Sequence, residues 1–265
     1  MEGIVIGQYV PGNSFLHRLD PRTKLIISAA LLWLIFLLGS PVEYVGFGLL
    51  VIFLYILSGV TGRLLRVLRP AMYLLLFTLG LNMIFTPGHV LLNLGLVVAT
   101  REGLIQGLTV GFRLVYLISL SSLVTLTTSP VRMTDGLETL MGPLKKARLP
   151  VSELAMMMNV ALRFIPAFWE EMDKIRKAQV SRGADFDSWH PSRRIKYMTA
   201  LLVPLLISAF RKAEELSVAM EARGYAVGMK RTSLHRLQLN LRDYMAILIV
   251  LILTTAFVFN KYFVQ

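Results

Sequence analysis

Residues 162–183, LRFIPAFWEEMDKIRKAQVSRG, and residues 202–224, LVPLLISAFRKAEELSVAMEARG, follow the same plan. Each begins apolar around a proline, becomes charged with a pair of glutamates, and ends in an Arg-Gly pair. The two Arg-Gly pairs lie 41 residues apart. This weak internal repeat predicts two long helices that each deliver an arginine at one end, with the rest of the chain as their membrane anchor.

The apolar parts of these predicted helices are short. Residues 154–162 and 198–210 are nearly all apolar, but a bilayer span needs roughly 20 residues. We therefore expect both helices to lie along the membrane face, apolar towards the bundle or lipid and charged towards the cytosol. Pro166 and Pro204 are expected to kink them, and residues 183–192 to form the loop between them.

The composition excludes an ordinary soluble domain. Of the 265 residues, 55% are apolar and only 17% are charged, against the usual quarter. The net charge is +12, and the basic residues cluster beside apolar segments. This favours a membrane face with acidic headgroups, and not nucleic acid, as their partner. Because there is no cysteine, disulfides and thiolate metal sites are excluded, and residues 1–12 do not resemble a signal peptide.

The expected fold is all-α and polytopic, with about five transmembrane helices. Asp20 and Pro21 predict a helix start, and residues 90–99 are too short to cross, so they are expected at the interface or in a re-entrant piece. The predicted spans are residues 25–38, 42–60, 71–85, 103–126 and 244–259. The first and third are short, which leaves the exact number of spans open.

Orientation follows from the basic residues in short loops. Arg18, Arg22 and Lys24 precede the first span, and three arginines lie between the second and third, whereas the alternate loops hold none and one. The positive-inside rule then places the N-terminus in the cytoplasm. The predicted division is N-terminal transmembrane helices in residues 1–127, a cytoplasmic domain of long helices in 128–243, and a last transmembrane helix in 244–265.

The Arg-Gly pairs admit two interpretations. Glycine in the left-handed conformation ends helices, and a basic residue in the last turn complements the helix dipole, so capping alone explains a single pair. Two copies in matched contexts favour docking on a partner, because a guanidinium can donate two parallel hydrogen bonds to a carboxylate in an interface.

The chain resembles the EcfT family of transmembrane coupling subunits of energy-coupling factor (ECF) importers, which are ABC-type vitamin and metal transporters. Ser181-Arg182-Gly183, Ala222-Arg223-Gly224 and the N-terminal segment HRLDPRTK (17–24) carry the resemblance, which covers essentially the whole chain. Ser181 departs from the alanine that the family prefers. The resemblance implies that each motif closes a coupling helix whose arginine docks on one of two ABC ATPases (A and A′ components).

The same resemblance implies a third partner, a small membrane S-component that binds the vitamin or metal. It also implies a non-catalytic subunit with no cofactor of its own, ATP being bound by the partner ATPases. Nine of the 13 methionines lie in residues 128–243, which suits a surface that re-packs against several partners, although ordinary core filling explains any single one equally well.

Other function classes have weak support. The chain has no Gly-x-x-x-x-Gly-Lys-Ser/Thr phosphate loop and no His-Glu-x-x-His metal helix, and its four histidines are scattered. Arg113 lies inside the predicted fourth span, where a structural pairing or a water-facing position is expected and no role is assigned. A self-contained membrane enzyme or an oligomeric channel stays the alternative. The transported substrate, and whether several S-components share this subunit, are not encoded in these residues.

Overall fold

The structure is a computed structural model that describes residues 9–93, 98–143, 150–186, 190–226 and 237–263. Within these ranges the chain is almost entirely helical, and the predicted all-α polytopic fold is confirmed. The elements are α1 (Phe15–Arg18), α2 (Pro21–Leu37), α3 (Pro41–Ser58), α4 (Thr61–Phe85), β1 (Val90–Asn93), β2 (Val98–Thr100), α5 (Arg101–Thr127), α6 (Pro130–Leu140), α7 (Val151–Ser181), α8 (Pro191–Ala222) and α9 (Leu241–Phe263).

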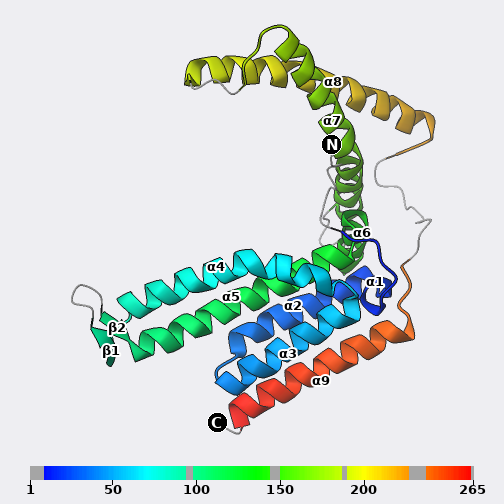
Figure 1. The fold of residues 1–265 in the computed structure, drawn as a ribbon. Coiled ribbons are helices and arrows are strands. Elements are labelled where there is room, and N and C mark those ends of the chain that lie inside the picture. Colours follow the sequence, from blue (N-terminus) through cyan, green and yellow to red (C-terminus); the bar gives the residue numbers. More distant parts are fainter. Residues whose placement is uncertain (1–8, 94–97, 144–149, 187–189, 227–236, 264–265) are drawn as a thin grey trace. The chain divides into compact units, whose positions relative to one another are not determined.

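The chain forms two compact units (Figure 1). The first comprises the described residues of Met1–Leu140 and Leu237–Gln265, and therefore brings α9 back onto the N-terminal helices. The second, Met141–Arg236, contains α7 and α8. The unit boundary near residue 140 lies after the predicted division at residue 128, because α6 packs on α2 and Gly136 faces Pro21 closely.

In the described chain, five helices are long and apolar enough to cross a membrane: α3, α4, α5, α7 and α9. Helix α2 has 17 residues and extends only ~26 Å, somewhat less than a hydrocarbon core of about 30 Å. The apolar run 154–162 was predicted to be too short to cross, but by length and composition the whole of α7 is not, because its continuous 31 residues contain a sufficiently apolar window. Its position along the membrane face stays a prediction.

The structure corrects one local prediction and adds detail to another. Arg63, Arg66 and Arg69 lie within α4 and not in a loop, since the helix begins at Thr61 and continues through Pro70. In the segment after α4, β1 and β2 pair antiparallel, with Val90 opposite Thr100, and its place at the interface or in a re-entrant piece stays a prediction. This pairing satisfies the backbone of a segment too short to span.

The core of the first unit lies between α2, α3 and α5. Ile35 and Tyr55 are fully buried there, and the Tyr55 hydroxyl donates to the carbonyl of Ser119, 3.0 Å away. The predicted cap of α2 is confirmed, since the Asp20 carboxylate accepts the Arg22 N–H at 2.9 Å with Pro21 in the first turn. Pro166 and Pro204 lie inside α7 and α8, and both helices continue through them.

Helices α4 and α5 lie side by side and are joined by β1 and β2 (Figure 1). Their closest approach follows Gly103, Gly107 and Gly111, one stripe at four-residue spacing on α5. A Cβ added at Gly107 would lie 3.0 Å from the Cα of Leu79. Small residues at this spacing let two membrane helices approach at backbone distance.

We predict that Gly107→Leu destabilises the chain, because the added side chain meets α4 backbone that has no room to move. Overpacking of this kind costs about 1–3 kcal/mol. The measurement is the thermal unfolding midpoint of the detergent-solubilised protein. Gly80→Leu is the matched control on α4, since nothing lies within 4 Å of a Cβ at Gly80. Equal midpoints for the two variants would contradict the close packing.

Candidate functional site

Helix α7 ends in a complete Schellman motif at the first predicted site. Ser181 is its last residue, Arg182 is the C-cap, and Gly183 has φ +87°. The N–H of Ala184 donates to the carbonyl of Gln179 at 3.0 Å, and the N–H of Gly183 donates to Val180 at 2.9 Å. These two bonds satisfy carbonyls that the helix end leaves unpaired.

Helix α8 repeats this geometry at the second predicted site. Ala222 is its last residue, Arg223 the C-cap, and Gly224 has φ +74°. The N–H groups of Tyr225 and Gly224 donate to the carbonyls of Met220 and Glu221, at 3.0 and 2.9 Å. The weak repeat in the sequence therefore corresponds to two equivalent helix ends, each with an arginine at the same position.

The side chains at both ends are free for a partner. Arg182 and Arg223 are exposed, and within the part of the chain that the structure describes neither guanidinium forms an ion pair or hydrogen bond. Nothing lies within 4 Å of a Cβ at Gly183 or Gly224, so the positive φ, and not crowding, requires glycine. Capping explains both glycines, but it does not use the arginine side chains.

Helices α7 and α8 cross in antiparallel directions. The Gln179 side chain donates to the carbonyl of Ala200 at 3.4 Å, while Lys212 lies 4.0 Å from Glu171 and over the ring of Phe168. As the residue numbers of α8 rise, α8 therefore runs along α7 from the C-terminal end of α7 towards the middle of α7. Arg182 ends α7 beside the first half of α8, whereas the end of α8 extends eleven residues, ~16 Å, beyond Lys212.

The two ends differ in charge. The ten residues before Arg182 contain Lys174, Arg176 and Lys177 against a single carboxylate, Asp173. The ten residues before Arg223 contain only carboxylates among their charged groups, namely Glu214, Glu215 and Glu221. The backbone of the two sites is therefore the same, but their electrostatic surroundings are opposite.

The N-terminal segment 17–24 forms a buried polar junction in the first unit. Asp243, which is 1% exposed, accepts the N–H of Asp20 at 2.8 Å and that of Asn240 at 2.9 Å. The Lys24 ammonium donates to the carbonyl of Thr127 and the hydroxyl of Thr128. The starts of α2 and α9 and the end of α5 are thereby joined, and sequence reasoning missed the part that Asp243 plays.

His17 fixes the position of the segment that precedes α1. Its ring lies 2.9 Å from the carbonyl of Val10 through Nε2 and 2.6 Å from the Ser14 hydroxyl through Nδ1. Because a carbonyl only accepts, Nε2 carries the proton and donates to Val10. Burial lowers the pKa of His17 below its ordinary value of 6.5, and the charge of Lys24 lowers it further.

Arg113 has the structural pairing that was expected. Its guanidinium donates to the Tyr44 hydroxyl at 3.3 Å and lies 5.6 Å from the centre of the Phe36 ring. The Tyr116 hydroxyl donates to the carbonyl of Tyr44 at 2.7 Å and closes this aromatic cluster. These partners place Arg113 where α5 passes the end of α2 and the start of α3, and they give it a role in packing.

Known proteins resemble the chain over nearly its whole length. The family model CbiQ, described as cobalt transport protein, matches residues 12–234. A Bacillus subtilis protein named energy-coupling factor transporter transmembrane protein EcfT is 44% identical over 263 residues, covering 98% of this chain and 99% of its own. Proteins of the same name from Brevibacillus brevis and Staphylococcus aureus are 46% and 42% identical, and cover 96% and 94% of this chain and 96% and 93% of their own.

We predict that Gly183→Ala and Gly224→Ala loosen the helix ends, because a side chain at positive φ costs about 1–2 kcal/mol. The amides of Ala184 and Tyr225 should then exchange their protons with deuterium faster, as measured by hydrogen-exchange mass spectrometry. Gly183→Asn and Gly224→Asn should preserve more protection, since asparagine tolerates this conformation. Gly142→Ala, also without neighbours but at ordinary φ, is the control and should change nothing.

We also predict a pH dependence from His17. Its folded-state pKa lies below 6.5, so its contribution to stability is complete above pH 6.5 and is lost as the pH falls through 6.5 towards the folded pKa. The thermal unfolding midpoint should decrease between about pH 7.5 and 5.5, and His17→Gln should flatten that decrease. The exposed His190, changed to Gln, should leave the slope intact; an equal flattening there would refute the assignment.

Proposed function

The chain belongs to the CbiQ family, and on that premise we propose that it transmits ATP-driven motion from two ABC ATPases to a substrate-binding membrane partner. As a multi-pass protein akin to EcfT, it is a transmembrane component of an energy-coupling factor transporter. The proposal adds how this component works: Arg182 and Arg223 dock on the ATPases, and α7 and α8 carry the motion.

One observation carries the proposal: two exposed arginines occupy the same C-cap position on two crossing helices, and neither has a partner among the described residues. A pair of equivalent contact points suits a pair of related motors. Each guanidinium fits a carboxylate-lined groove, where a charge-assisted hydrogen bond contributes roughly 1.5–3 kcal/mol.

The helices suit transmission because they are long and cross each other. When the two ATPases close on ATP, both docked ends move, and the crossing at Glu171 and Lys212 turns that displacement into a change of angle between α7 and α8. We propose that this change acts on a vitamin- or metal-binding S-component in the same membrane. The ATP is bound and hydrolysed by the ATPases, the N-terminus is cytoplasmic, and the membrane is the bacterial plasma membrane.

We predict that Arg182→Glu and Arg223→Glu each weaken co-purification with the ATPases and abolish substrate uptake. Losing one charge-assisted contact and placing a carboxylate before acidic groups should reduce affinity roughly tenfold to more than a hundredfold. The measurement is ATPase recovery on the tagged chain, together with uptake of the transported vitamin or metal into proteoliposomes. Arg182→Lys should retain part of both, since it keeps the charge but loses the fork.

The control is Arg211→Glu, the same charge reversal at an exposed position on α8 far from its end. This variant should assemble and transport as the unmodified chain does. If both end variants keep full assembly and transport, the docking role is refuted. If Arg211→Glu is equally damaging, the effect belongs to the overall charge of α8 and not to the helix ends.

A further inference from the structure

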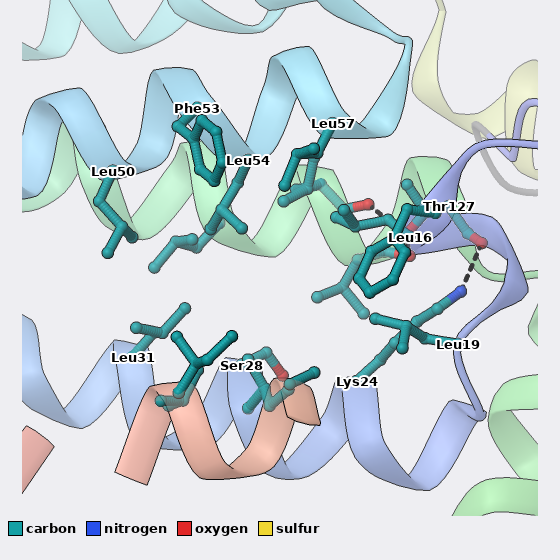
Figure 2. A pocket seen from close by; sticks show the side chains of 18 of the residues that line it. Leu16, Leu19, Lys24, Ser28, Leu31, Leu50, Phe53, Leu54, Leu57 and Thr127 are labelled. Carbon is teal, nitrogen blue, oxygen red and sulfur yellow. Dashed lines mark hydrogen bonds between the residues drawn. The ribbon is translucent and has the colours of Figure 1, made fainter. Parts of the chain in front are cut away.

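A cavity of about 270 Å³ opens between α2, α3, α5 and α9 within the first unit (Figure 2). Its walls are almost wholly apolar, with leucines of α2 and α3 pointing into the gap from opposite sides. Apolar cavities exclude water, and one of about 150 Å³ already holds a benzene molecule. This cavity therefore has room for a larger apolar group.

The cavity has a buried floor and an exposed mouth. Leu31, Leu120 and Leu123 form the floor and are each less than 5% exposed. Phe53 of α3 and Ile249 of α9 lie at the mouth and are 57% and 55% exposed. Since α3 and α9 are both apolar enough to span the membrane, the mouth opens towards hydrocarbon. A partner helix, about 10 Å wide with its side chains, is too broad to enter such a volume.

One end of the cavity is cationic. Lys24 lines it there, beside Ser28 and Thr127 (Figure 2). Arg242 also lines the cavity, and it lies at this end because its neighbour Asp243 bonds the N–H of Asp20 at the start of α2. Lys24 is 8% exposed, and its ammonium donates one N–H to Thr127 and one to Thr128. An ammonium has three N–H groups, so one remains for a ligand. Over the described residues no carboxylate forms an ion pair with Lys24.

The nearest acids, Asp243 and Asp20, act on Lys24 with opposite charge, but neither reaches ion-pair distance. Asp243 directs its two oxygens to the backbone N–H groups of Asp20 and Asn240, and Asp20 caps α2, so neither carboxylate contacts the ammonium. Arg132 is close enough to act on Lys24 with like charge. A buried cation is costly unless an anion neutralises it, so this end of the cavity is suited to a negatively charged group.

We propose that the cavity binds one acyl chain of an anionic phospholipid, whose phosphate lies between Lys24 and Arg242. The ligand combines the two features that the cavity combines, an apolar chain and an anionic end. The lipid belongs to the leaflet at the N-terminal end of α2. By filling the space between α9 and α3, it holds the C-terminal helix against the bundle.

The test is native mass spectrometry of the full chain, purified in mild detergent and titrated with phosphatidylglycerol and with phosphatidylcholine of the same acyl chains. The chain should retain one phosphatidylglycerol and bind it at least about fivefold more tightly than phosphatidylcholine, the factor expected from one basic residue at a membrane surface. Arg242→Gln should lower this preference about fivefold. Lys24 is left unchanged, because it also holds α5.

Ala246→Phe fills the cavity and should abolish the single tight site for both lipids. Its control is Leu248→Phe on the same helix, which is exposed and does not line the cavity, and the control for Arg242→Gln is the exposed Arg66→Gln. Both controls should bind as the unmodified chain does. The proposal is overturned if Ala246→Phe retains the lipid, if both headgroups bind equally, or if no lipid is retained and Ala246→Phe instead weakens co-purification of a partner protein.

Discussion

The fold of the first unit depends on one buried carboxylate, that of Asp243, which accepts the N–H groups of Asp20 and Asn240. Asp20 and Asp243 are 223 positions apart, yet this contact joins the starts of α2 and α9. Without it, the buried N–H of Asp20 at the start of α2 would have no partner, at a cost of about 1–3 kcal/mol. The insertion of α7 and α8 between α6 and α9 is therefore compatible with one compact bundle, because the bundle closes on itself through this junction and not through the inserted residues.

The need to pair backbone polar groups also explains why so few residues determine the geometry of the two Arg-Gly helix ends. A helix end leaves carbonyls unpaired, and the Schellman geometry satisfies them with two N–H groups of the following residues. Only Gly183 and Gly224 are constrained, by their positive φ. Ser181 and Ala222 are exposed ordinary helix residues, so the replacement of the family's alanine by serine at 181 is conformationally neutral; the serine hydroxyl simply donates to the carbonyl of Lys177. The arginines are left without a structural task, and this makes them available for a partner.

The sequence predicted local features well and distant contacts poorly. The cap at Asp20 and the helix ends at residues 181 and 222 follow from neighbouring residues, and the structure has them. The start of α4 was missed, because the prediction followed the apolar run from residue 71, whereas the helix begins ten residues earlier and includes the three arginines and Pro70. The pairing of Arg113 with Tyr44 and the role of Asp243 were beyond prediction, since each joins segments far apart in the chain and neither partner carries a recognisable spacing.

The charge difference between the two helix ends bears on what they bind. Equal backbone geometry would allow two identical partners, and the proposed docking requires only a carboxylate opposite each arginine. The surroundings differ, however: basic residues precede Arg182, whereas Glu214, Glu215 and Glu221 precede Arg223. An acidic groove that suits the first end would repel the glutamates of the second, because like charges brought together in an interface oppose binding. Under the proposed function, two different ATPases satisfy this constraint better than two copies of one. The one with the more acidic rim would take the end of α7, so that these charges, and not the arginines themselves, would fix which motor occupies which site.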